Sequence, residues 1–265
     1  MISSTHLAHW RKHQAPWAQP GLVEHDLVLS RCLVLLFQNK TLAARVALRG
    51  GTALNKLFYQ SHARFSEDID LVQIAADANG PLIDAIRDSL DPIFGEAPKR
   101  KIGQGVTTLT YRFITNEGLT LKLKIETNTR EHQALLPLET HNFVVDSTWF
   151  QGAAIIPTYA LEELLGTKLR ALYQRRKGRD LYDFWALGQE FNTDVALVLK
   201  AFHHYLNHQN LKVSKIEFEQ NLEAKLQDEI FRADMPPLLR TGVVYNVDEA
   251  YAWFREKILT CWNGD

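Results

Sequence analysis

The chain has 265 residues, of which 46% are hydrophobic and 23% charged, and its formal net charge is −1. This ordinary globular composition suits one large domain or two modest ones. The near-neutral charge excludes a global field that recruits nucleic acid, so a polyanion would need a local basic patch. The two cysteines, Cys32 and Cys261, lack metal-ligand spacing, which indicates a reduced, cytoplasmic protein without structural zinc.

No apolar run of the sequence is long enough to span a bilayer, and the N-terminus lacks a signal-peptide pattern. We therefore expect no membrane partner. Residues 1–20 are rich in His, Trp, Gln and Pro, and we expect them to form a loosely packed segment. Residues 24–38 follow with Leu27, Cys32 and Leu36 at helical spacing, which predicts a helix.

The most informative segment lies at residues 46–74. An apolar strand end is followed by the turn Gly50-Gly51-Thr52, then by a short amphipathic helix, and then by Asp68-Ile69-Asp70 at the start of an apolar run. A glycine turn before a helix presents backbone N–H groups to phosphate oxygens. Carboxylates at i and i+2 of a strand share a face and can hold one hard cation. This ordered combination indicates nucleotidyl transfer; the simpler alternative is a tight turn beside solvated acids.

A β-hairpin is the clearest strand signal. After a helix predicted at residues 81–90, apolar and polar residues alternate over 107–113 and again over 119–126, separated by a polar turn ending in Gly118. The polar face of the second strand carries Lys122, Lys124 and Glu126. Glu126 is a candidate third metal carboxylate, since two-metal phosphoryl-transfer sites are built from several carboxylates; the alternative is a solvated strand end.

From about residue 158 the pattern becomes entirely helical. Helices are predicted over residues 158–175, 180–189, 194–207, 214–231 and 248–262. We place the domain boundary near residues 152–157, where strand character ends. The sequence thus predicts an α/β (α+β) domain over residues 1–155, including an N-terminal helical segment, and an α-helical domain over residues 156–265.

Lys168 lies within the apolar stripe of the first of these helices, four residues after Leu164 and four before Leu172. A lysine in such a stripe must extend to solvent or meet an anion. If the helix faces the metal site, the anion is a nucleotide phosphate. The alternative is an ion pair with a buried acid.

A basic turn follows Lys168, with Arg175, Arg176, Lys177 and Arg179 in five residues. It is the best local candidate for holding a triphosphate or an RNA backbone, and the alternative is solvated surface. Asp180 and Asp183 fall in the next helix's first turn, where acids complement the helix dipole. No Walker A, Gly-x-Gly-x-x-Gly or nucleophile-elbow pattern occurs, which argues against P-loop, Rossmann and serine-hydrolase chemistry.

Together these motifs resemble the AbiEii/AbiGii nucleotidyltransferase toxin family of the polymerase-β-like superfamily. The resemblance rests on Leu48-Arg-Gly-Gly-Thr-Ala-Leu54, on Arg64-Phe-Ser-Glu-Asp-Ile-Asp-Leu71, and on Lys168 followed by Arg179-Asp-Leu-Tyr-Asp183. These motifs cover part of the chain but occur in the family's order. The resemblance implies a polymerase-β-like domain with a mixed sheet, followed by a helical domain.

The resemblance also implies Mg²⁺-dependent transfer of a nucleoside monophosphate from an NTP, with Mn²⁺ as a possible substitute. Thr52 matches the motif's Ser/Thr, Asp68 and Asp70 match the metal ligands, and Lys168 and Asp180 match the later lysine and aspartate. Glu126 has no distinctive motif and rests on strand geometry alone. Several such toxins are thought to modify tRNA 3′ ends and stop translation, and a cognate antitoxin neutralises them.

The resulting hypothesis is a cytoplasmic toxin that transfers a nucleotide to RNA. Its expected metal ligands are Asp68, Asp70 and Glu126, its expected catalytic residues Asp68, Asp70, Lys168 and Asp180, and its expected nucleotide-binding residues Gly50, Gly51, Thr52, Lys168, Arg175 and Arg179. Two rivals stay open: the same chemistry on a protein hydroxyl or a small molecule, and a non-catalytic module that binds nucleotide or antitoxin. The paired acids Asp68 and Asp70 argue against the second rival.

Overall fold

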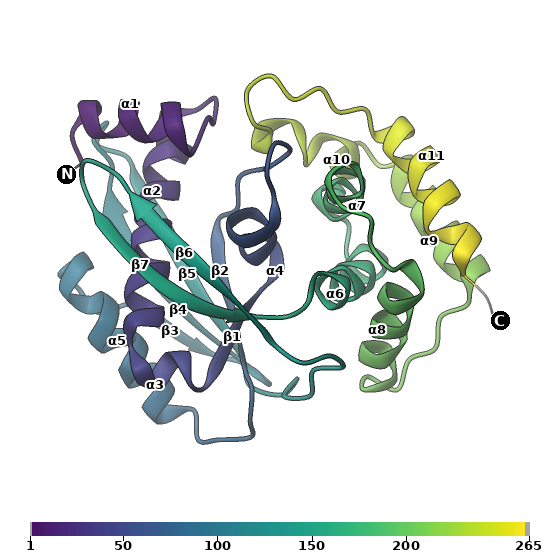
Figure 1. Ribbon diagram of the computed structural model, residues 1–265, viewed down its shortest axis with the longest axis horizontal. Coiled ribbons are helices and arrows are strands. Elements are labelled where there is room, and N and C mark those ends of the chain that lie inside the picture. The colour runs from purple at the N-terminus through teal and green to yellow at the C-terminus, as the bar shows by residue number, and fades with distance from the viewer. Residues whose placement is uncertain (1, 263–265) are drawn as a thin grey trace. The chain divides into compact units, whose positions relative to one another are not determined.

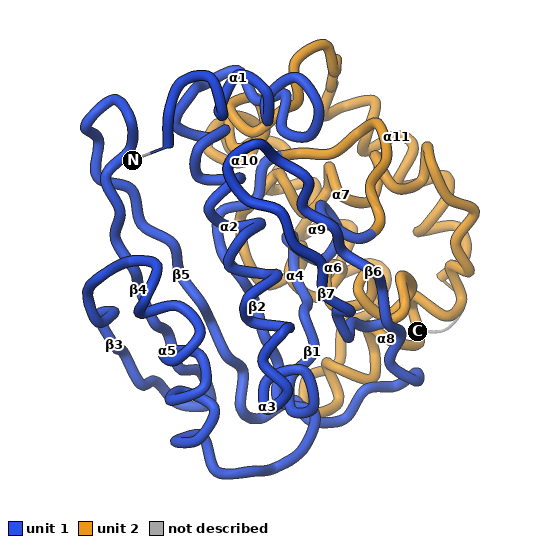
Figure 2. Tube along the Cα trace, turned by 60° about the vertical axis from the view of Figure 1, so that its left-hand side comes forward, with its two compact units in different colours: residues 1–57, 65–159 blue, residues 58–64, 160–265 orange. Residues whose placement is uncertain are grey.

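The computed structural model describes residues 2–262, which form two compact units. Unit 1 comprises Met1–Leu57 and Phe65–Tyr159, and unit 2 comprises Phe58–Arg64 and Ala160–Asp265 (Figure 2). The division falls a few residues after the expected boundary, because the last strand of unit 1 continues to Thr158, where it pairs with Leu48. The assignment of residues 58–64 to unit 2 has no counterpart in the sequence pattern.

Unit 1 is built on a seven-stranded mixed sheet of order β3-β4-β5-β2-β1-β7-β6. Its central strand β2 runs antiparallel to β1 and parallel to β5, and β1 runs parallel to β7. The strands are β1 (Val46–Arg49), β2 (Asp68–Gln73), β3 (Lys99–Ile102), β4 (Val106–Ile114), β5 (Thr120–Asn128), β6 (Glu139–Asp146) and β7 (Gln151–Thr158). The mixed sheet predicted from the resemblance is therefore present.

The predicted hairpin is β4 and β5. Leu109, Tyr111, Leu123 and Ile125 are buried on one face, as their alternation predicts. Gly118 closes the turn with a φ of 81°, a left-handed conformation that glycine adopts without steric cost. This register fixes which face of the sheet is polar.

The helices of unit 1 are α1 (Ser4–His13), α2 (Pro20–Gln38), α3 (Lys40–Ala43), α4 (Gly50–Ala53) and α5 (Gly80–Phe94), with a π-helical segment at Leu54–Phe58. Helix α2 packs along the sheet, with contacts to β7, β6, β2 and β5 (Figure 1). It is buried on nearly every side, including Asp26, whose carboxylate accepts hydrogen bonds from Trp10 and Lys56.

The expectation of a loosely packed N-terminal segment is wrong. Ser3 caps α1 by accepting a hydrogen bond from the His6 backbone N–H, and Trp10 and Trp17 are both buried. The Trp10 indole N–H donates to Asp26 at 2.9 Å, so a partner on α2 orders residues that lack a strong local pattern.

Unit 2 is helical, as predicted. Its helices are α6 (Leu161–Gln174), α7 (Gly178–Glu190), α8 (Val195–Asn207), α9 (Lys215–Leu226), α10 (Glu229–Ala233) and α11 (Val247–Lys257), with 3₁₀ turns at Pro236–Leu238 and Leu259–Cys261. The helix expected over residues 214–231 is two helices, because the Asp228 side chain caps the start of α10. The one expected over 248–262 ends at Lys257 and continues as a 3₁₀ turn. None of the described helices is long and apolar enough to cross a membrane.

Candidate active site in unit 1

The glycine turn follows directly from β1. Gly50 has a φ of 75° and opens α4, so the chain leaves the sheet in a conformation that L side chains rarely adopt. A Cβ atom at Gly50 would overlap the Asp70 carboxylate, because the turn lies against that side chain. Glycine is therefore needed for its φ angle and also for the close approach of backbone to carboxylate.

Thr52 is fully buried. Its hydroxyl donates to the Asp68 carbonyl oxygen at 2.5 Å and lies 2.8 Å from the Ser66 hydroxyl. These bonds hold the turn against the start of β2. The Thr52 side chain is thus a structural tie, and any contact from this residue to a phosphate would come from its backbone.

The two aspartates share one face of β2. Asp68 and Asp70 are half-buried, whereas Ile69 and Leu71 between and after them are buried on the other face. On the neighbouring strand β5, Lys124 lies opposite Asp68 and Glu126 lies opposite Asp70. Directly paired residues point to the same side of a sheet, so Glu126 shares the face of both aspartates. This is the strand geometry on which its prediction as a third carboxylate rests.

The carboxyl group of Asp68 is partly buried and lies near other carboxylates. Burial raises its pKa to about 6, and the nearby carboxylates of Asp70, Glu67 and Glu126 act in the same direction. The Lys124 ammonium, 3.6 Å from the Asp68 carboxylate, opposes this shift without cancelling it. Asp68, Asp70 and Glu126 bring three carboxylates to this face beside the Lys124 ammonium, an arrangement that favours a bound cation.

The oxygen-only donor set of Asp68, Asp70 and Glu126 suits Mg²⁺ or another hard divalent ion. The side chains are not gathered around one point, however: within residues 2–262, no three His, Cys, Asp or Glu side chains form a group able to hold a metal. Chemistry and charge thus fit a divalent cation, and the carboxylates would have to turn toward it.

The raised pKa of Asp68 has a measurable consequence for stability. Because folding favours the protonated carboxyl, Asp68 costs increasing stability as pH rises from about 4 to about 6. We expect Asp68→Asn to raise the melting temperature of the metal-free protein at pH 8, with the gain shrinking toward pH 5. Calorimetry in EDTA from pH 5 to 8 measures this, with the exposed Asp84→Asn on α5 as control. A pH-independent difference would contradict the account.

The later motif residues belong to unit 2, where they form a buried ion-pair cluster. The Lys168 ammonium on α6 lies 3.0 Å from Asp180 and 2.9 Å from Asp183, both on α7. Both aspartates are fully buried, and Lys168 is only 5% exposed. The structure therefore shows the alternative left open for Lys168, an ion pair with buried acids. Arg175, whose side chain is about half exposed, forms a second ion pair with Asp180, at 2.7 Å.

Asp183 is the centre of this cluster, and sequence reasoning assigned it no site role. It accepts hydrogen bonds from Tyr59 at 2.8 Å and from Arg64 at 2.7 Å, in addition to its ion pair with Lys168. Burial alone would raise the pKa of Asp183, but the Arg64 and Lys168 charges hold it well below its usual range. In the sequence, only the spacing of Asp180 and Asp183 on one helix indicated that Asp183 could belong to the cluster. Nothing near Arg64 in the sequence indicated that it would be a partner.

The basic turn is largely compensated by acids. Arg179 and Lys177 pair with Asp234, at 3.1 and 3.5 Å, and Arg176 pairs with Asp228 at 3.2 Å. Arg175, as described, pairs with Asp180. The charge available to a polyanion at this turn is therefore smaller than the run of cations indicates.

The sequence and fold both have recognisable relatives. Residues 32–254 match the family model described as "Nucleotidyl transferase AbiEii toxin, Type IV TA system". No curated protein matches the chain. Among solved structures, the fold is similar to MenT4, a nucleotidyltransferase toxin from Mycobacterium tuberculosis H37Rv, with a TM-score of 0.68 and 20% identity over 100% of this chain and 92% of that one.

A second similar structure comes from H. pylori and carries a provisional nucleotidyltransferase designation. It has a TM-score of 0.56 and 16% identity over 88% of this chain and 91% of that chain. At these identities the two structures show the shared fold, and the family match supplies the function. The glycine turn, the paired aspartates and the Lys168–Asp180 pair all fall within the matched range. The chain belongs to the AbiEii family of nucleotidyltransferase toxins of type IV toxin–antitoxin systems.

Proposed function

We propose that this nucleotidyltransferase toxin uses Mg²⁺ to transfer a nucleoside monophosphate from an NTP to RNA, at the 3′ end of tRNA, and so blocks translation. The observation that carries the proposal is the contact between the Gly50 turn and the Asp70 carboxylate, with Asp68 and Glu126 on the same face. Backbone N–H groups that could bind phosphate oxygens would then lie beside carboxylates that could hold the metal, as the reaction requires.

In unit 1, backbone groups would bind phosphate and acidic side chains would bind the metal. Backbone N–H groups of Gly50 and Gly51, at the start of α4, would bind phosphate oxygens. Asp68, Asp70 and Glu126 would hold Mg²⁺, or Mn²⁺ in its place. The cation supplies charge neutralisation and lowers the pKa of the acceptor hydroxyl.

In unit 2 we assign contact with phosphate to the arginines of the basic turn, and a supporting role to Lys168 and Asp180. Arg175, 51% exposed, would supply positive charge to a phosphate, and its guanidinium is held by Asp180, which also pairs with Lys168. Arg179 would contribute charge at the edge of the same turn, beside Asp234. The cluster of Arg64, Lys168, Arg175, Asp180 and Asp183 carries three positive and two negative charges, which leaves it suited to an anion.

The biological setting follows from the family. A type IV toxin–antitoxin system implies a cognate antitoxin as partner. We place the protein in the cytoplasm, where NTPs and tRNA are found.

The acceptor is identified by incubating the protein with each α-labelled NTP and Mg²⁺, with purified total RNA in one arm and RNase-treated lysate protein in the other. Label in the tRNA band, released by enzymes that remove terminal nucleotides, supports the proposal. Label in protein or in small molecules alone would overturn the RNA acceptor while leaving the enzyme class intact.

A further inference from the structure

The face of the sheet that carries the aspartates continues outward as a basic surface. On the rung of Asp68, the paired residues across β5, β4 and β3 are Lys124, Thr110 and Lys99. On the rung of Asp70 they are Glu126, Thr108 and Lys101. Because paired residues share a face, the two rows run side by side from the carboxylates to the sheet edge.

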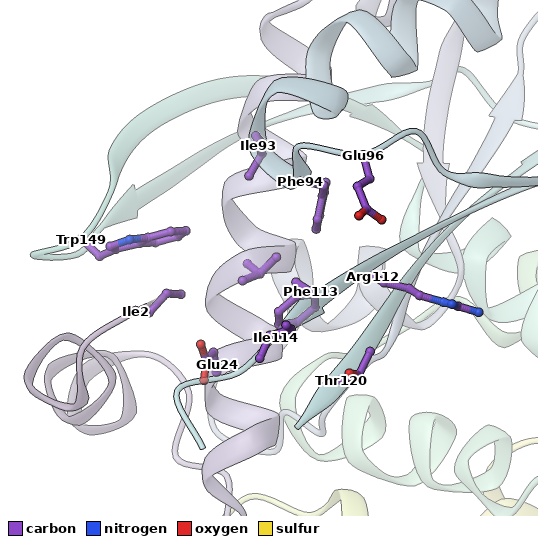
Figure 3. A pocket seen from close by; sticks show the side chains of 11 residues that line it. Ile2, Glu24, Ile93, Phe94, Glu96, Arg112, Phe113, Ile114, Thr120 and Trp149 are labelled. Carbon is purple, nitrogen blue, oxygen red and sulfur yellow. The ribbon is translucent and has the colours of Figure 1, made fainter. Parts of the chain in front are cut away.

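The same face has a third row, formed by Arg112 of β4 and Lys122 of β5. Figure 3 shows that Phe113 lies beside α2, whereas Arg112 extends away from that helix. The opposite face is the buried one, with Leu109, Tyr111 and Ile125. The basic residues therefore occupy the face that the core leaves uncovered, and we call Lys99, Lys101, Arg112, Lys122 and Lys124 the basic sheet face.

Of the basic sheet face, Lys124 pairs with Asp68, and the other four cations are not neutralised locally. Lys99, Lys101, Arg112 and Lys122 are exposed, and within residues 2–262 none of them forms an ion pair with an acid. On this face β3 and β4 carry no acidic residue over their described ranges; the acids begin at Glu126 and β2. A chain with a net charge of −1 thus concentrates positive charge on one side of its carboxylates. Such a surface fits a polyanion.

The outer part of the basic sheet face, on β3, lies far from the aspartates at which the phosphates would react. Neighbouring strands lie about 4.8 Å apart, so Lys99 and Lys101 on β3 are three strands, about 14 Å, from Asp68 and Asp70. A nucleotide held at the aspartates and the Gly50 turn does not need cations so far away. A nucleic acid strand does, because it presents a phosphate at every nucleotide.

We propose that the basic sheet face binds the phosphate backbone of the RNA acceptor and leads its reactive end to Asp68 and Asp70. This inference rests on the proposed function, to which it adds the acceptor's binding surface. Lysines contribute affinity here without reading sequence, and Thr108 and Thr110 supply neutral hydroxyl donors between them.

Edge strand β3 offers a matched set of variants. Lys99 and Lys101 lie on the basic sheet face. Arg100 between them is also exposed and forms no ion pair within the described residues, but it points to the other face. We expect Lys99→Glu and Lys101→Glu each to raise the KM for deproteinised total tRNA about tenfold, and to lower the salt dependence of tRNA binding by about 0.7–0.9 per lost contact. The KM for the NTP and the kcat at saturating tRNA should not change, and Arg100→Glu should match the wild type.

Binding is measured by fluorescence anisotropy of labelled total tRNA over a salt series, independently of turnover. If the wild type labels tRNA and the β3 variants keep its KM and salt slope, this inference is overturned and the proposed function stands. If Arg100→Glu loses as much as Lys101→Glu, the effect is one of general surface charge, and the inference is overturned as well. If the wild type neither binds nor labels tRNA, the proposed RNA acceptor itself has failed.

Discussion

Gly50→Ala is expected to lower kcat about 100-fold or more while the protein remains folded. Two effects combine at this residue. The φ of 75° costs an L side chain about 1–2 kcal/mol, and the new methyl group would overlap the Asp70 carboxylate. Either the turn or Asp70 must move, and displacement of a reacting group by about 1 Å costs about 100-fold in rate. Steady-state transfer from an α-labelled NTP measures the loss.

Gly95 provides the control for this variant. Its φ is 72°, nearly that of Gly50, and a Cβ there would meet no atom within 4 Å. Gly95→Ala therefore imposes the same backbone strain without a collision. It should lose a similar amount of stability and keep full activity. Equal kcat values for the two variants would show that the close approach of the turn to Asp70 is irrelevant to catalysis.

Asp183→Asn is expected to destabilise unit 2 by about 3–5 kcal/mol, since it removes one partner of a buried charge cluster. Asparagine keeps the shape of the side chain but leaves Arg64 and Lys168 short of a counter-charge in a site that water does not reach. Hydrogen exchange of the α6 and α7 backbone amides measures the stability of unit 2 separately from that of unit 1. Amide protection there should fall by roughly two to four orders of magnitude.

Asp248→Asn breaks an exposed ion pair in the same unit. It tests whether burial is the reason for the large loss of stability expected of Asp183→Asn. Asp248 pairs with Arg232 at 2.6 Å, but its side chain is 64% exposed. Exposed pairs of this kind contribute little to stability, because water and salt screen the two charges. Comparable losses in the two variants would contradict the special position assigned to Asp183.

The parts of the fold that follow local periodicity could be predicted from the sequence. The hairpin of β4 and β5 alternates strictly, so the sequence predicted which of its residues share a face. The pairing of β5 with β2, which places Glu126 opposite Asp70, is supplied by the structure. Strands β3 and β6 were missed. β3 consists mainly of exposed cations, and β6 carries the exposed apolar residue Val144 where a polar one would complete the alternation.

The parts that depend on distant partners could not be predicted. Arg64 and Asp183 are 119 residues apart, and neither position shows locally that it will be buried with the other. The N-terminal segment is ordered by the bond from Trp10 to Asp26 on another helix. For Lys168 the apolar stripe predicted an anion and left its identity open; the anion is supplied by Asp180 and Asp183.

The basic turn shows why a run of charge is a weak guide to binding. Arg176, Lys177 and Arg179 all meet acids from the segment 228–234, which lies about 50 residues further along the chain. The lysines of β3 are less conspicuous in the sequence because they alternate with other residues. Their register with β4, β5 and β2 is what joins them to the carboxylates, and only the structure supplies it.

The central claim, that phosphodiester chemistry takes place at the carboxylate face of β2, is tested most directly by the fate of two labels. Wild-type protein and Asp70→Asn are incubated with total tRNA, Mg²⁺ and NTP labelled either at the α- or at the γ-phosphate. We expect tRNA to acquire label from the α-phosphate alone, and Asp70→Asn to transfer at least about 1000-fold less while staying folded. Transfer of the γ-label, or equal α-label from Asp70→Asn, would contradict it.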